Sequence, residues 1–249
     1  MMMAKVALLL ALCCLTQPCL AQTTVLQVVT ELSPPHQTIE NGDVAGLSTE
    51  LVKSILTEAD IEGQFQIYPW ARALHIAMRQ PNVLIYNMAR TAEREAQFNW
   101  IGEIAFYQLG FVKLTHRTDI HIQSLKDALQ YRIAAQREDI SANFLLKQGF
   151  EDGKQLVLVT DIAESWQLLI NNKVDLVIDD AKALKGMAKT LNFPSEYVQF
   201  EFAIAELEQR TWLAASINTP GQTVQRLQQA HAKIATSKRF EQIMAAQYE

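Results

Sequence analysis

The chain has 249 residues, with 22 lysines and arginines against 27 aspartates and glutamates, and its formal net charge is −5. A mildly acidic chain whose charges are scattered has no basic patch for nucleic acid, so we exclude that class of partner. The three cysteines, Cys13, Cys14 and Cys19, all lie near the amino terminus. The rest of the sequence offers no disulfide framework and no cysteine nucleophile, so an ordinary hydrophobic core must stabilise it.

The first 21 residues have the three parts of a secretory signal peptide. Lys5 gives a positive start, residues 6–15 form an apolar stretch too short to span a bilayer, and Ala21 is a small residue before the expected cut. No later run offers the ~18 continuous apolar residues that a membrane-spanning helix needs. We therefore expect removal of residues 1–21 and a soluble, monomeric protein in the periplasm.

Strand-like runs alternate with helix-like runs along the rest of the chain. Runs rich in β-branched or aromatic residues predict strands at 25–30, 65–68, 83–86, 132–135, 156–159 and 174–178. Leu47, Leu51, Ile55 and Ala59 are spaced four apart, as one face of a helix requires, and residues 144–150 and 166–170 favour two more helices. Strands that alternate with helices of this length form helix-covered parallel sheets, so the predicted fold class is α/β.

Two extended runs, 111–115 and 197–204, follow the first and second sets of strands and helices. If both cross between two lobes, the first lobe is discontinuous. We predict that lobe one consists of residues 22–113 and 203–249, and that lobe two consists of residues 114–202. The sequence has no Pro/Gly/Ser-rich linker, which favours lobes that are tightly joined.

The segment from 85 to 98 contains the most informative arginine. A strand is expected to end near Tyr86, and a short helix is expected to begin after Thr91, whose hydroxyl can cap the first turn. Arg94 then lies at the carboxyl end of a parallel strand, where clefts form in α/β sheets, and its planar fork matches a carboxylate. The alternative is an exposed helix in which Arg90 and Arg94 pair weakly with Glu93 or Glu95.

The run from 90 to 98, Arg-Thr-Ala-Glu-Arg-Glu-Ala-Gln-Phe, resembles the Thr-x-x-Arg-x-x-x-x-Phe segment of the family 3 extracellular solute-binding proteins. These are the amino-acid-binding subunits of ABC importers, and in that family this arginine, here Arg94, grips the ligand's α-carboxylate. Residues 46–51 and 131–150 resemble two further family segments. Residues 172–180 resemble a fourth, whose last aspartate, here Asp180, often receives the ligand's ammonium group.

This resemblance covers essentially the whole chain after residue 21. It implies a two-lobed type II periplasmic-binding-protein fold, with two mixed sheets flanked by helices and a hinged cleft. It also implies a small polar ligand, an ABC permease as the membrane partner, no cofactor and no catalytic activity. The family usually has Ser or Thr where this chain has Ala89, and glycine where it has Glu138.

The segment 68–74 points to a subgroup whose first lobe carries Pro-Trp-x-Arg-Ala. Trp70 and Arg72 would then give an aromatic face and a second cation to the mouth of the cleft. The alternative is that Trp70 and Leu74, four residues apart, pack their helix on the sheet.

Four further residues complete the candidate set. Arg137 and Asp139 lie in a predicted strand-to-helix turn whose amides favour an anion, although Asp139 or Ser141 could instead cap the helix. Glu31, just past the first strand, and Asn87 are weaker candidates.

Catalytic and metal chemistry have little support in the sequence. There is no phosphate-binding glycine loop and no nucleophile elbow, and the five histidines have no metal-site spacing. Two rival functions remain open. One is a periplasmic sensing subunit of a signalling protein, and the other is a dehydratase-like enzyme with Glu31 or Glu138 as its general acid.

Overall fold

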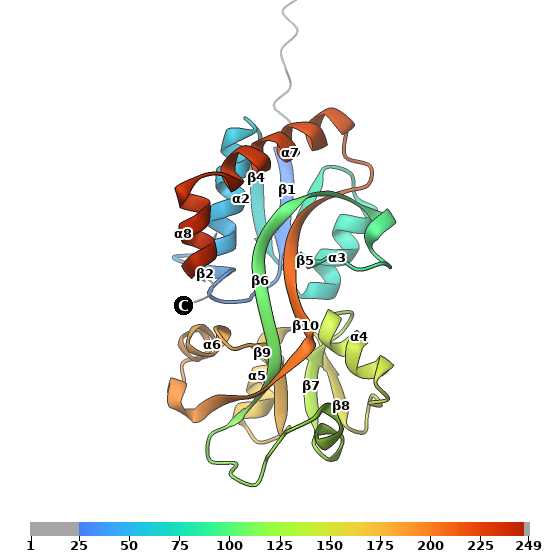
Figure 1. Ribbon diagram of the computed structural model, residues 1–249, viewed down its shortest axis with the longest axis vertical. Coiled ribbons are helices and arrows are strands. Elements are labelled where there is room, and N and C mark those ends of the chain that lie inside the picture. Colours follow the sequence, from blue (N-terminus) through green and yellow to red (C-terminus); the bar gives the residue numbers. More distant parts are fainter. Residues whose placement is uncertain (1–24, 247–249) are drawn as a thin grey trace, which may run out of the picture.

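The computed structural model describes residues 25–246, so the expected signal segment lies outside the described residues. The described chain forms an upper lobe and a lower lobe, joined by the two long strands β6 and β10 (Figure 1). None of the described helices is both long and apolar enough to cross a membrane.

The strands and helices alternate in the order that the sequence predicts. The strands are β1 (Val25–Thr30), β2 (Thr38–Glu40), β3 (Asp43–Ala45), β4 (Glu62–Ile67), β5 (Val83–Ala89), β6 (Phe98–Leu114), β7 (Ile133–Gln136), β8 (Leu156–Val159), β9 (Leu176–Asp180) and β10 (Val198–Ser216). The α-helices are α2 (Leu47–Glu58), α3 (Trp70–Arg79), α4 (Ile140–Lys147), α5 (Ile162–Ile170), α6 (Ala183–Leu191), α7 (Gly221–Ala235) and α8 (Lys238–Ala246). Short 3-10 helices are η2 (Glu95–Gln97), η3 (Leu125–Gln130) and η4 (Ser195–Tyr197).

One eight-stranded sheet runs through both lobes in the order β4-β1-β5-β10-β6-β9-β7-β8. β1 is parallel to β4 and β5, and β7 is parallel to β8 and β9. β10 and β6 are antiparallel to each other and connect the two parallel sets. The two sheets expected from the family resemblance are therefore joined into one, because β6 and β10 belong to both.

The upper lobe buries both faces of its sheet. Successive side chains of a strand point to opposite faces, so Val28 packs in a core with α2 and α7 while Val29 packs in a second core with α3. Leu51 and Ile55, one turn apart on α2, are fully or almost fully buried in the first of these cores. Burial on both faces explains why β5 is apolar at most of its positions, whereas β4, at the edge of the sheet, alternates between exposed and half-buried residues.

The lower lobe repeats this arrangement. Ile133 and Ala135 of β7 lie in a core with α4, whereas Ala134 between them lies in a core with α5 and α6. Trp166 of α5 is the largest side chain of the second core and is fully buried.

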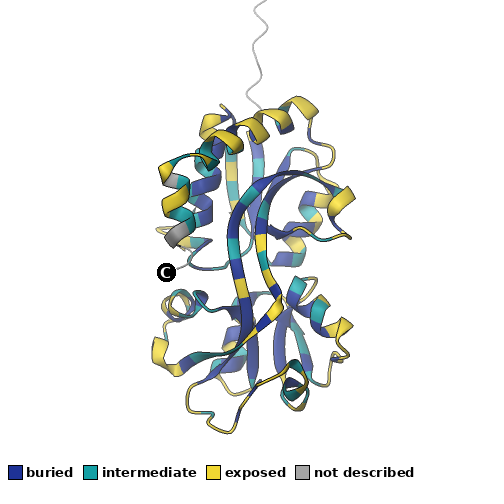
Figure 2. Ribbon diagram, viewed as in Figure 1, coloured by how far each residue is buried: buried dark blue, intermediate teal, exposed yellow. Residues whose placement is uncertain are grey.

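The crossing strands pair from Phe98 opposite Ser216 to Leu114 opposite Val198, with interruptions in the ladder. Their register shifts between the pairs Ala203–Gly110 and Glu208–Gln108, at the level between the lobes. Figure 2 shows this part of β10 as mostly exposed, between a mostly half-buried segment in the lower lobe and a buried segment in the upper lobe. The chain thus passes between the lobes in the middle of two long strands, not in the short extended segments expected from the sequence. The lobe boundaries at 113 and 203 stay a prediction.

Candidate ligand-binding site

A cavity of about 60 Å³ lies between the lobes. Both parallel sets of strands direct their carboxyl ends toward it, which is where clefts of open α/β sheets form. Its walls combine charged, hydroxyl, amide and apolar side chains from both lobes: Glu31, Leu32, Ser33, Trp70, Asn87, Ala89, Arg94, Tyr107, Leu109, Ala135, Gln136, Asp139, Ile140, Ser141, Ile162, Ile178, Asp179, Gln209 and Thr211.

Five of the eight predicted site residues line this cavity: Glu31, Trp70, Asn87, Arg94 and Asp139. The structure does not bring the other three, Arg72, Arg137 and Asp180, into its lining. Ser33, Tyr107, Gln136 and Asp179 line it without having been predicted.

Arg94 reaches the cavity from a turn. The short helix predicted after Thr91 is the 3-10 helix η2, which begins only at Glu95, so Arg94 precedes it and does not lie in its first turn. η2 has no side-chain cap, and Thr91 instead accepts a backbone hydrogen bond from the Arg94 amide at 3.0 Å. This tight return directs Arg94 inward.

Arg94 is 9 % exposed, and its guanidinium contacts both lobes. Its Nη1 donates to the carbonyl of Ala89 at 3.2 Å, and its Nη2 donates to the carbonyl of Glu138 at 3.3 Å. The Trp70 ring lies under it, with the guanidinium carbon 5.1 Å from the ring centroid. Burial lowers the pKa of Arg94, and the negative charge of Asp139 opposes that effect.

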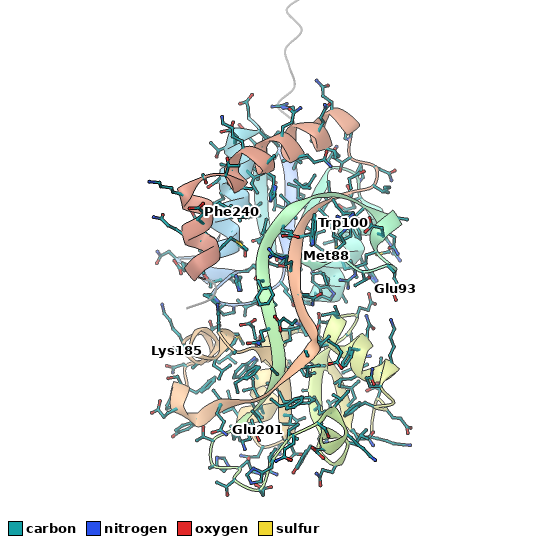
Figure 3. All side chains as sticks on the ribbon, viewed as in Figure 1. Met88, Glu93, Trp100, Lys185, Glu201 and Phe240 are labelled. Carbon is teal, nitrogen blue, oxygen red and sulfur yellow. The ribbon has the colours of Figure 1, made fainter. Side chains whose placement is uncertain are left out.

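Arg90 is a surface arginine that pairs with a glutamate, as the alternative interpretation of this segment predicted. Its guanidinium pairs with Glu95 and stacks 4.6 Å from the centroid of Trp212. Glu93 lies at the edge of the upper lobe that faces the lower lobe (Figure 3), where it forms a 3.0 Å ion pair with Lys147 of α4.

Trp70 and Glu138 form a direct connection between the lobes. The Trp70 Nε1 donates to the Glu138 carbonyl at 3.0 Å, while the Glu138 carboxylate pairs with His75 at 3.0 Å. Glu138 has φ of 60°, the left-handed region that favours the glycine expected at this turn. Trp70 also packs with Leu74 in the core. It therefore both packs its helix on the sheet and lines the cavity.

Asn87 belongs to a hydrogen-bond network in the wall of the cavity. Its Nδ2 donates to Ser48 Oγ at 3.1 Å and to Tyr107 Oη at 3.0 Å. Tyr107 also bonds to Gln37 and Ser33. Burial raises the pKa of Tyr107 well above its usual range, so the phenol keeps its proton.

Three carboxylates line the cavity together with Arg94: Glu31, Asp139 and Asp179. Burial, reinforced by the charge of Asp139, raises the pKa of Glu31 to about 8. Burial likewise raises the pKa of Asp179 to about 7, although its carboxylate accepts hydrogen bonds of 2.7 Å from Trp166 Nε1 and from the amide of Asp180. Asp139 caps α4 by accepting from the Ser141 amide at 3.1 Å, as the capping alternative predicted.

The carboxylate of Asp180 accepts hydrogen bonds from backbone amides of the protein itself. Its two carboxylate oxygens accept hydrogen bonds from the amides of Gln108, at 2.7 Å, and Lys182, at 2.8 Å. It thereby connects β6 to the turn that begins α6. Among the carboxylates of β9, Asp179 lines the cavity instead.

Arg72 and Arg137 lie along a separate open groove of about 610 Å³, together with His75 and Arg79. Arg72 stacks on Tyr68 with 4.4 Å between its guanidinium carbon and the ring centroid, and Arg137 donates to the Leu158 carbonyl at 3.1 Å. No group of three or more potential metal ligands lies together within the described residues.

The sequence matches no protein-family profile, and no curated protein matches it. Solved structures match most of the chain. A histidine kinase sensor domain with similarity to periplasmic binding proteins has 18% identity and a TM-score of 0.78, covering 90% of this chain and 96% of its own. An ancestral arginine-binding protein bound to arginine has 18% identity and a TM-score of 0.77, covering 90% and 98%.

This is the two-lobed periplasmic-binding-protein fold. A third example of the periplasmic-binding-protein fold is the GluR0 ligand-binding core from Nostoc punctiforme in complex with L-glutamate. It has 22% identity, a TM-score of 0.69 and coverage of 88% of this chain and 96% of its own. The fold is therefore common to an amino-acid-binding protein and a sensor domain, and the chemistry of the cavity must indicate the function.

Proposed function

We propose that this chain is a periplasmic solute-binding protein that captures a small ligand through a carboxylate group and encloses it by hinge closure. The observation that carries the proposal is the state of Arg94. It is buried at the cavity, and both of its hydrogen bonds there go to carbonyls. Within residues 25–246, no carboxylate lies within ion-pair distance of it.

A buried charge without an ion-pair partner is unfavourable, because it has lost most of its hydration. A ligand carboxylate would neutralise Arg94 and match its planar fork with two parallel hydrogen bonds. The Ala89 carbonyl occupies only part of that fork, and the contact with Glu138 crosses between the lobes. Ligand binding would therefore replace a contact that exists only in the closed arrangement.

Contacts between the upper lobe and the lower lobe support hinge closure. Trp70 with Glu138, Gln136 with Glu31, and Lys147 with Glu93 each join the two lobes. A cavity of about 60 Å³ holds only a few water-sized groups. A larger ligand must therefore enter after these contacts break, with β6 and β10 bending between the lobes.

The proposal has two versions, which differ in the membrane protein that recognises the closed form. Delivery to an ABC permease follows from the sequence resemblance, including the Pro-Trp-x-Arg-Ala subgroup, while a role as a sensing subunit is supported by the sensor-domain match. A closed form that differs from the open form would serve either partner. Genomic neighbours encoding a permease and an ATPase, or a sensor kinase, would separate the two.

An enzyme of the dehydratase type is a second candidate with one favourable observation. Glu31 lines the cavity and has a pKa near 8, so it holds a proton at neutral pH, as a general acid requires. Glu138 is less suited, because its carboxylate pairs with His75 and lies outside the cavity lining. Turnover of a bound cyclic carboxylate, abolished in Glu31→Gln, would support this candidate.

A thermal-shift screen tests the proposed function. Purified protein is heated with amino acids, small carboxylates, polyamines and peptides, together with the variants Arg94→Met and, as a matched control, the exposed arginine variant Arg132→Met. A ligand present at 100 times its Kd stabilises the fold by about 2.7 kcal/mol, which raises Tm by roughly 5–10 °C in a chain of this size. We expect carboxylate-bearing hits that Arg94→Met loses and Arg132→Met keeps; hits that bind Arg94→Met equally well contradict the proposal.

A further inference from the structure

Arginines from both lobes line the groove that lies outside the central cavity. Arg72 and Arg79, seven residues apart on α3, line it from the upper lobe, and Arg137, in the turn after β7, lines it from the lower lobe. The groove has a volume of about 610 Å³. We call it the arginine groove. Because its three arginines are far apart in the sequence, no run of positive charge indicates this surface before the chain folds.

The three arginines have no ion-pair partner within residues 25–246. Four other arginines of the surface do have one: Arg90 with Glu95, Arg117 with Asp119 and Asp175, Arg210 with Glu103, and Arg226 with Asp60. No aspartate or glutamate of the described part of the chain lines the groove. In a chain whose net charge is −5, the arginine groove is therefore a local excess of positive charge.

Two of the guanidinium groups are held in place without being neutralised. Arg72 stacks on the ring of Tyr68 at 4.4 Å, and Arg137 donates a 3.1 Å hydrogen bond to the carbonyl of Leu158. Neither contact supplies a negative charge. Both arginines therefore keep their charge available to a partner, at a smaller cost in side-chain ordering than a free arginine would have.

The groove is complete only while the lobes are together. One wall is α3, and the other is formed by Arg137 and Thr160. A 3.0 Å contact between His75 Nε2 of α3 and Glu138 Oε2 in the turn after β7 connects the two walls. This contact directs the Glu138 carboxylate to His75 and away from the arginines. A partner that contacts the arginines of both walls therefore distinguishes the closed form from the open form.

The shape and chemistry of the groove favour a polypeptide with several carboxylates. Arg72 and Arg79 are separated by about 10 Å along the helix axis. A chain that carries several carboxylates matches this spacing better than a single small anion does. Pro69, Ala71 and Ile76 add apolar surface to the same groove. A membrane surface is too flat to follow a groove between two lobes, so an acidic segment with interspersed apolar residues is the best match.

We propose that the arginine groove binds an acidic polypeptide segment of the membrane partner, and that it does so in the closed form. The partner is the permease or sensor of the proposed function, so the inference rests on that function. Guanidinium groups bind carboxylates through two parallel hydrogen bonds, and the apolar walls would cover the side chains between those carboxylates.

Selection from a random peptide library tests the chemistry of the partner. The purified protein selects displayed peptides of about 12 residues, long enough to follow the groove in an extended form. Counter-selection uses the triple variant Arg72→Gln, Arg79→Gln and Arg137→Gln. We expect the selected peptides to be enriched in aspartate and glutamate. Peptides without this enrichment, or selection of the same peptides by the triple variant, would overturn the proposal.

Fluorescence anisotropy with a selected acidic peptide then assigns the contacts. The triple variant should weaken peptide binding about 10-fold, the combined effect of three exposed ion pairs. A second triple variant, Arg132→Gln with Lys185→Gln and Lys189→Gln, removes the same charge from exposed positions outside the groove. Lys185 lies at the left edge of the molecule in Figure 3, away from α3 at the right of Figure 1. Equal losses in both triple variants would indicate only nonspecific attraction and would contradict the proposal.

Removing the arginines of one lobe at a time tests recognition of the closed form. Arg137→Gln alone, and Arg72→Gln together with Arg79→Gln, should each weaken peptide binding about 3-fold. Full binding by Arg137→Gln would confine the site to the upper lobe and contradict closed-form recognition. A Tm equal to that of the wild type shows that each variant is folded.

Other anionic partners are separate arms of the test. Vesicles of phosphatidylglycerol and duplex DNA should not bind through the three arginines, and binding of either that the triple variant loses would overturn the proposal. The groove and carboxylate capture also fail separately. Peptide binding that survives in the triple variant refutes the groove, whereas thermal-shift hits that survive in Arg94→Met refute carboxylate capture.

Discussion

The indole nitrogen of Trp70 donates a 3.0 Å hydrogen bond to the backbone carbonyl of Glu138, which joins α3 of the upper lobe to the turn after β7 in the lower lobe. Arg94 donates to the same carbonyl. One carbonyl thus receives two upper-lobe donors, and it can do so only when the lobes are together. The Glu138 carbonyl thus connects the two lobes in the closed arrangement.

Trp70→Phe should shift the unliganded protein toward an open form. The substitution keeps an aromatic ring in the core but removes a hydrogen bond of about 0.5–1.5 kcal/mol, so the ratio of open to closed molecules should rise about 2- to 10-fold. Small-angle X-ray scattering should give a larger radius of gyration than for the wild type. Trp212→Phe, which changes a tryptophan of the upper lobe away from the seam, is the control; an equal change in both variants would count against a specific role for Trp70.

A buried ion pair should contribute strongly to the stability of the lower end of the crossing strands. Lys113 Nζ lies 2.8 Å from Glu201 Oε2, with 4 % and 13 % of the side chains exposed, and Lys113 also donates to the Ile120 carbonyl. Lys113→Met leaves the Glu201 charge uncompensated, so the free energy of unfolding should fall by about 3 kcal/mol. Urea denaturation measures this, and Lys113→Met with Glu201→Met should recover part of the loss. A change below about 0.5 kcal/mol in the single variant would contradict this interpretation.

The raised pKa of Glu31 makes stability depend on pH. Its pKa is 4.5 in the reference state and about 8 in the fold, so between these values the folded protein holds a proton that the unfolded chain has released. The contribution of Glu31 is therefore present at pH 4.5 and is lost as pH rises through 8. Glu31→Gln should raise Tm relative to the wild type at pH 8 and leave it nearly unchanged at pH 4.5. Thermal unfolding at both values checks this, and a Tm gain of the same size at both pH values would be inconsistent with it.

His36 should make the protein sensitive to acid. Burial, together with the charge of Lys182, lowers its pKa from 6.5 to about 3. Below pH 6.5 the unfolded chain gains a proton that the folded protein does not, so stability is lost as pH falls from 6.5 toward 3. His36→Phe keeps a ring against Tyr107, whose centroid lies 4.7 Å away, and removes the titration.

Urea denaturation at pH 7 and pH 4.5 compares the two proteins. We expect a smaller loss of stability on acidification for His36→Phe than for the wild type. The exposed histidine variant His121→Phe should behave as the wild type does. The same pH dependence in all three proteins would exclude His36 as the cause.

Strands buried on both faces could be predicted well from the sequence. Val25–Thr30 and Leu156–Val159 have the predicted limits, because both are rich in β-branched or other apolar residues and are bounded by polar or turn residues. β6 and β10 could not be delimited in this way. Each crosses from one core to another; β10 is exposed around Glu208 between the cores, and β6 is interrupted only by the exposed Gln108, so neither strand shows where one lobe ends.

Residues that line the cavity could be predicted where a charged residue follows the end of a strand. Glu31 follows β1 and Arg94 follows β5, and both line it. Gln136 and Tyr107 were missed because neutral polar side chains in apolar strands have no distinctive sequence pattern. Asp180 was chosen over Asp179 by resemblance, but neighbouring residues of a strand point to opposite sides, and only Asp179 lines the cavity.

The central claim is carboxylate capture by Arg94, and a crystal structure of the protein with a ligand from the thermal-shift screen tests it most directly. We predict two ligand carboxylate oxygens about 2.7–2.9 Å from the Arg94 guanidinium nitrogens, the distance of a charge-assisted hydrogen bond. A ligand bound in the groove beside Arg72, or one whose carboxylate lies away from Arg94, would contradict the claim.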